Sequence, residues 1–87
     1  MEPARLRSEI KRLIVSELQL VGRDPESIDD DAPLFATGLG LDSLDALQLA
    51  MSLETHLGVK IPEGEAARPV FASVRAIAEH VARERGW

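Results

Sequence analysis

The sequence predicts an all-α fold, a bundle of three main helices and one short helix with a long first loop. Three segments carry apolar residues at three- and four-residue spacings, as one buried face of a helix requires. No segment alternates apolar and polar residues over the length of a strand. The 87 residues are enough for one domain with a thin core, so we expect residues 1–87 to form a single domain.

The first helix is predicted to run from Pro3 to about Leu20. Its apolar residues fall on one face and are Leu6, Ile10, Leu13, Ile14 and Leu18. Proline is favourable in a first helical turn, where the backbone N–H has no partner within the helix. Gly22 is typical of a residue just past a helix end, so it predicts where this helix stops.

A long loop is predicted from Arg23 to Leu41, because proline, glycine and a run of aspartates oppose regular structure there. Four of its side chains are too apolar for a solvated linker and should pack onto the core: Ile28, Leu34, Phe35 and Leu39. The triplet Asp29-Asp30-Asp31 lacks the pattern of a calcium loop, and we interpret it as a solvated turn.

The remaining helices are predicted from their caps. Asp42 is a good N-cap for a helix from Ser43 to Leu57, and Gly58 provides its C-terminal stop. A short helix is expected over Glu63–Arg68, ending before Pro69. Ser73 should cap the last helix, whose core face is Val74, Ile77, Ala78, Val81 and Ala82.

The second helix has apolar residues where its pattern predicts water. One face is apolar and comprises Ala46, Leu49, Ala50, Leu53 and Leu57. The opposite face is polar and comprises Asp45, Gln48, Ser52 and Thr55, yet Leu44 and Met51 lie with it. Either the long loop covers these two side chains, or they form a surface for partner proteins. Methionine suits such a surface because its flexible side chain repacks easily.

The charge distribution argues against nucleic acid as a partner. The net charge is −5, and residues 24–65 hold ten acidic residues and one basic residue, Lys60. An anionic surface repels nucleic acid and favours basic protein partners. The chain has no cysteine, no apolar stretch long enough to span a bilayer and no apolar signal region after Met1, so we expect a cytoplasmic protein without membrane insertion. We also expect a monomer.

Ser43 lies at the predicted start of the second helix, but its surroundings do not predict a catalytic serine. A nucleophilic serine needs a positioned base and an oxyanion site. His56 lies more than three helical turns further along the same helix, and His80 lies among exposed positions of the last helix. We interpret both histidines as surface residues, and neither they nor the aspartates have the spacing of a metal site.

The segment Gly40-Leu41-Asp42-Ser43-Leu44 resembles the acyl carrier protein family, and the resemblance extends over nearly the whole chain. Further matching segments are Leu34–Leu39, Leu49–Glu54 and Gly58–Pro62. The resemblance implies that a phosphopantetheinyl transferase attaches 4′-phosphopantetheine to Ser43. The thiol of that arm would carry acyl thioesters to enzymes such as a ketosynthase and an acyltransferase, and the helices could part to shelter the acyl chain. The carrier would itself not be an enzyme.

The resemblance also implies a partner surface around Ser43, formed by Asp42, Leu44, Asp45, Gln48 and Met51. Gln48 replaces a usually acidic residue, which weakens the anionic stripe of the fatty-acid type and favours a specialised lipid or polyketide-type pathway. Two alternatives stay open at this point. One is a carrier of aminoacyl or peptidyl groups, and the other is an unmodified helical docking domain.

Overall fold

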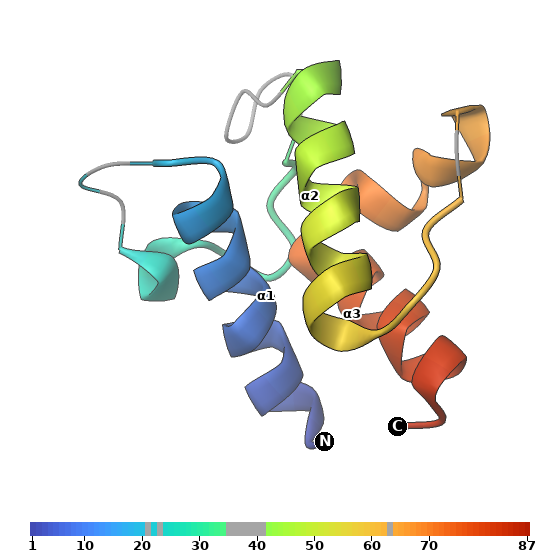
Figure 1. Cartoon of the computed structure of the whole chain (residues 1–87). Coiled ribbons are helices and arrows are strands. Elements are labelled where there is room, and N and C mark those ends of the chain that lie inside the picture. Colours follow the sequence, from blue (N-terminus) through green and yellow to red (C-terminus); the bar gives the residue numbers. More distant parts are fainter. Residues whose placement is uncertain (21, 23, 35–41, 63) are drawn as a thin grey trace.

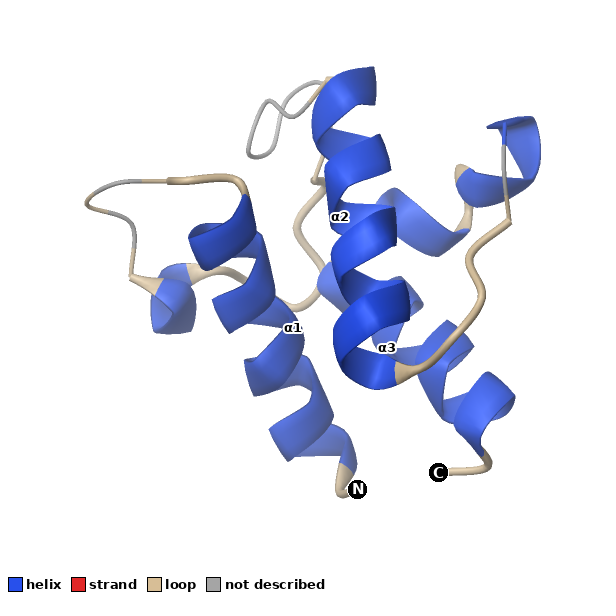
Figure 2. Cartoon of the chain, viewed as in Figure 1, coloured by secondary structure: helices blue, strands red, loops and turns tan. Residues whose placement is uncertain are grey.

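The computed structural model describes residues 1–20, 22, 24–34, 42–62 and 64–87, apart from the side chain of Ser43. Three α-helices form the bundle: α1 (Pro3–Glu17), α2 (Ser43–Leu57) and α3 (Val74–Arg85). Three 3-10 helices join them: η1 (Pro25–Ser27), η2 (Gly64–Ala67) and η3 (Val70–Ala72). Within these ranges no strand occurs, so the predicted all-α fold is confirmed (Figure 2).

The bundle places the start of α2 at the end opposite the two termini (Figure 1). Helix α1 packs against both α2 and α3. The core includes residues from all three helices, chiefly Leu6, Ile10, Ile14, Leu49, Leu53, Val74, Ile77 and Val81. Ile28 and Leu34 are buried among them, which confirms that the first loop is anchored to the core. Phe35 and Leu39, the other two predicted anchors, lie outside the described residues.

Helix α1 ends earlier than predicted, at Glu17 and not near Leu20. Gln19 takes a left-handed conformation with φ 52°, and the Leu20 N–H donates to the Val15 carbonyl oxygen at 3.0 Å. This hydrogen bond closes the last turn as in a Schellman motif, a position where glycine is usual. The prediction from Gly22 was wrong because the turn occurs at a glutamine three residues earlier.

The aspartate triplet forms a turn with Asp29 and Asp31 exposed, as predicted, but Asp30 is paired and not freely solvated. Asp30 Oδ2 lies 2.9 Å from Arg7 Nε, and its Oδ1 lies 2.6 Å from Lys11 Nζ, so the loop is bound to α1. The backbone carbonyl of Asp30 accepts the Arg75 N–H at 2.9 Å, and the Asp31 carboxylate pairs with the Arg75 guanidinium. The two carboxylates therefore connect α1 and α3 through the loop.

These ion pairs lower the pKa of both carboxyl groups. The pKa of Asp30 lies below its ordinary value, first because Lys11 donates to the carboxylate and then through the nearby charges of Lys11 and Arg7, while burial opposes the shift. The pKa of Asp31 is lowered first by the hydrogen bond from Arg75. Both groups thus favour the folded state in their charged form.

The chain between α2 and α3 contains two short helices where one was predicted. The predicted helix over Glu63–Arg68 is shorter and of the 3-10 type, η2, and η3 follows it after Pro69. Phe71 in η3 is only 3% exposed, so it packs in the core. In the described part of the chain, no helix is long and apolar enough to cross a membrane.

Candidate functional site

The N-terminal end of α2 is held by a capping box around Ser43. Asp42 Oδ1 accepts the Asp45 N–H at 3.0 Å, and Asp45 Oδ2 accepts the Asp42 N–H at 3.1 Å. Each carboxylate thereby satisfies a backbone donor that the helix leaves unpaired. As predicted, Asp42 is the N-cap and Ser43 is the first helical residue. The cap fixes the backbone on both sides of the serine.

The face of α2 that follows Ser43 carries exposed apolar side chains. Leu44 is 75% exposed and Met51 is 60% exposed, so neither side chain is buried. Leu47, also 60% exposed, joins them and was missed from the sequence. The spacing of these residues, i, i+3 and i+7, was the signal that could have revealed one continuous stripe. We call Leu44, Leu47 and Met51 the α2 apolar patch.

Gln48 was predicted to belong to the partner surface, and its side chain also binds α1. The Gln48 amide Nε2 donates to the backbone carbonyl oxygen of Glu17, in the last turn of α1. This carbonyl is one of those that a helix end leaves unsatisfied, so the amide side chain completes α1 from outside. An ionised acidic residue at this position could not donate this hydrogen bond, because a carboxylate only accepts.

Ser52 was wrongly placed on the exposed polar face, because its side chain is only 8% exposed. The physical reason is that α1 packs against this side of α2, where Gln48 and His56 both contact Glu17, so the buried arc of α2 is wider than its pattern predicts. A small hydroxyl side chain fits such a close approach of two helices. The exposed arc of α2 is accordingly narrower than the polar face read from the sequence.

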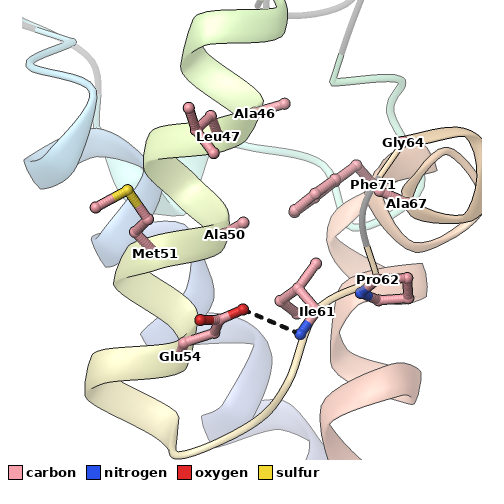
Figure 3. Close-up of a pocket in the computed structure, with 10 residues that line it drawn as sticks. All are labelled: Ala46, Leu47, Ala50, Met51, Glu54, Ile61, Pro62, Gly64, Ala67 and Phe71. Carbon is pink, nitrogen blue, oxygen red and sulfur yellow. Dashed lines mark hydrogen bonds between the residues drawn. The ribbon is translucent and has the colours of Figure 1, made fainter.

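An apolar pocket adjoins the α2 apolar patch, between α2 and the segment that leads to α3 (Figure 3). Its volume is about 440 Å³. The pocket is lined by Ala46, Leu47, Ala50, Met51, Glu54, Ile61, Pro62, Gly64, Ala67 and Phe71. Sequence reasoning missed it because its two walls come from separate segments, residues 46–54 and 61–71, that meet only through the tertiary packing. Ala46 and Ala50 leave room on the α2 side because they are small.

The two histidines lie away from the start of α2. His56 is exposed in the last turn of α2, and its Nε2 lies 3.3 Å from Glu17 Oε1. His80 is half-buried, less exposed than predicted, and its Nε2 lies 2.9 Å from the Lys60 carbonyl oxygen, beyond the C-terminal end of α2. Thirteen residues of helix separate Ser43 from His56, which is about 20 Å at 1.5 Å per residue. The described contacts thus pair neither histidine with this serine.

Comparison with known proteins identifies the family. Residues 8–81 match the family model described as "Phosphopantetheine attachment site". An acyl carrier protein of Thermosynechococcus vestitus is 35% identical over 78% of this chain and 79% of its own length. Phthioceranic/hydroxyphthioceranic acid synthases of Mycobacterium bovis and Mycobacterium tuberculosis are 38% identical over 91% of this chain. The matched part is only 3% of each synthase.

The residues that match the family model include the whole candidate site. The matched range contains α2 with its capped serine, the α2 apolar patch and the pocket. A carrier domain of this family works with the acyl-processing enzymes of a synthase. The chain therefore belongs to the phosphopantetheine attachment-site family and is an acyl carrier that bears 4′-phosphopantetheine.

Proposed function

We propose that Ser43 is the residue that carries 4′-phosphopantetheine, and that the thiol of this arm delivers acyl thioesters to enzymes of fatty-acid, specialised lipid or polyketide-type synthesis. Residues 1–87 act as one monomeric carrier domain without catalytic activity of its own. A phosphopantetheinyl transferase loads the arm, and enzymes such as a ketosynthase and an acyltransferase act on its cargo. The synthase names among the relatives support a specialised lipid as product.

The observation that carries this proposal is the position of Ser43 in the structure. Ser43 is the first residue of α2, between the exposed residues Asp42 and Leu44, so the backbone at this serine reaches the surface. A helix N-terminus also favours a phosphodiester through its unpaired N–H groups and its dipole. The Asp42 and Asp45 carboxylates oppose this charge, but each is held by a backbone N–H of the capping box. The site therefore fits the phosphopantetheine group.

The pocket supports an acyl cargo. Its walls are mainly apolar, and it begins at Ala46, one turn of α2 after Ser43. Burying a methylene group contributes about 0.8 kcal/mol, so an alkyl chain gains free energy by entering such a pocket. An arm attached at Ser43 would bring the chain to the pocket from the same end of α2.

The α2 apolar patch supports docking to partner enzymes. Leu44, Leu47 and Met51 are exposed on the same helix as Ser43, so an enzyme that receives the arm would contact them at the same time. Desolvation of exposed leucine and methionine side chains stabilises such a contact without a strong dependence on salt.

Intact mass measurement tests the attachment site. The wild-type protein, Ser43→Ala and the control Ser16→Ala are incubated with coenzyme A and a broad-specificity phosphopantetheinyl transferase. Ser16 is an exposed serine of α1, so its removal should change nothing. We expect one phosphopantetheine adduct on the wild type and on Ser16→Ala, and none on Ser43→Ala. An adduct that persists on Ser43→Ala would refute the assignment.

A loading assay separates the alternative functions. Holo protein is offered acyl and aminoacyl donors with their cognate loading enzymes, and the thioester is measured by mass. Preferential acyl loading supports the proposal, whereas preferential aminoacyl loading identifies an aminoacyl or peptidyl carrier. An active transferase that never modifies the folded wild type would instead favour an unmodified docking domain.

A further inference from the structure

The pocket that adjoins the α2 apolar patch ends at a charged side chain. Figure 3 shows Ala46 and Leu47 at one end of the pocket and Glu54 at the other, where Glu54 Oε2 accepts the Ile61 N–H. The hydrogen bond measures 3.3 Å and is half-buried. It joins α2 to the segment that forms the opposite wall. Glu54, an exposed residue, therefore lies across the end of the pocket far from Ser43.

A second hollow lies directly behind this closure. Its volume is about 620 Å³, and it is lined by Glu54, Lys60, Ile61, Pro62, His80 and Glu84. Glu54, Ile61 and Pro62 line both spaces, so they form the partition between them. The first pocket is mainly apolar, whereas the second contains the charged side chains of Lys60 and Glu84. The Glu54–Ile61 hydrogen bond thus lies between a mainly apolar space and a more polar one.

We infer that Glu54 is a specificity-determining residue that limits the length of acyl chain this carrier can shelter. Ala46, Ala50 and Glu54 follow one another at four-residue steps, so the pocket extends along α2 for about 12 Å. A chain gains burial with each methylene until it reaches Glu54. A longer chain must displace the Glu54 side chain and break its hydrogen bond to Ile61, which opposes entry.

This inference rests on the proposed attachment at Ser43, and one experiment tests it. A phosphopantetheinyl transferase loads the full chain from acetyl-, butyryl-, hexanoyl-, octanoyl-, decanoyl- and palmitoyl-coenzyme A. Intact mass confirms each loading, and the melting temperature of each acyl form is compared with that of the holo form. For the wild type we expect the melting temperature to rise with chain length and then to stop rising.

Three variants locate the limit. Glu54→Ala removes the partition, so the rise should continue to longer chains. Glu54→Gln keeps the size of the side chain and an acceptor oxygen for the Ile61 N–H, so it should keep the wild-type limit. Thr55→Ala is the matched control, because Thr55 is exposed on the same helix and lines neither space.

Amide hydrogen exchange in the wild type provides a second readout, which does not depend on how the variants fold. The Ile61 amide should stay protected with short chains and lose protection when a chain longer than the limit is loaded. The inference is overturned if Glu54→Ala keeps the wild-type limit, if Glu54→Gln loses it as Glu54→Ala does, or if Ile61 protection is independent of chain length. Failure to load any chain would overturn the attachment at Ser43 and this inference together, whereas complete loading without a length limit would overturn the inference alone.

Discussion

The link that Asp30 forms between the first loop and α1 gives a quantitative prediction. Its carboxylate contacts Arg7 and Lys11 at 2.9 and 2.6 Å, and its side chain is 25% exposed. An exposed ion pair contributes about 0.2–1 kcal/mol and a hydrogen bond to a charged group about 1.5–3 kcal/mol. Because asparagine keeps one acceptor oxygen, Asp30→Asn should lower the free energy of unfolding by about 1–2 kcal/mol near neutral pH, which corresponds to roughly 5–15 °C in Tm.

The pH dependence of this loss follows from the lowered pKa of Asp30. A carboxyl group whose pKa is lower in the folded state stabilises the protein above its unfolded-state pKa of about 3.9, and this contribution is lost as the pH falls through the folded pKa. The difference in unfolding free energy between wild type and Asp30→Asn should therefore be largest near neutral pH. It should begin to decrease near pH 4 and disappear as the pH falls through the lowered folded pKa.

Urea unfolding followed by circular dichroism, repeated over a series of pH values, measures this difference. The control is Glu26→Gln, which removes the same charge from an exposed residue of the same loop. It should change stability little, because surface substitutions usually stay within about 0.5 kcal/mol. A loss for Asp30→Asn that is equal at neutral and acid pH, or equal to that of the control, would refute the reasoning.

Three further substitutions test the core, the contact between helices and the partner surface. Phe71→Ala should cost about 3–5 kcal/mol because it leaves a cavity in a thin core, measured by urea unfolding; a loss under 1 kcal/mol would contradict this packing. Gln48→Glu should lower the free energy of unfolding by about 0.5–1.5 kcal/mol, since its side chain can no longer donate to the Glu17 carbonyl, and unchanged Tm would argue against that bond. Met51→Asp should leave the circular dichroism spectrum and Tm nearly unchanged but slow acyl transfer to partner enzymes, with Ala72→Asp as an exposed control; unfolding of Met51→Asp would mean that the side chain is core.

The start of α2 could be predicted from the sequence because helix capping is local. The hydrogen bonds of the capping box join Asp42 and Asp45, only three residues apart, so the segment contains nearly all the information that determines where the helix begins. The same holds for the cap of α3, where Ser73 Oγ accepts the Ala76 N–H at 3.1 Å. The position proposed for the phosphopantetheine arm therefore followed from local chemistry and family resemblance together.

Where the prediction was wrong or incomplete, contacts between distant segments decided the structure. Ser52 is buried on the side of α2 where Gln48 and His56 contact Glu17 of α1, and a single-helix pattern does not contain that packing. The end of α1 depends on a left-handed glutamine, Gln19, which intrinsic propensity disfavours and the closing hydrogen bonds stabilise.

The sequence alone determined the number of main helices, the caps of α2 and α3, the apolar faces and the place of Ser43, because each depends on periodicity or on hydrogen bonds over a few residues. The tertiary structure alone decided that Asp30 and Asp31 join α1 to α3, and that Ala46, Glu54 and Phe71 enclose a pocket. These features require side chains up to 44 residues apart along the chain to meet. Such meetings are set by how helices of given shape pack together, and neither composition nor spacing within one helix specifies that packing.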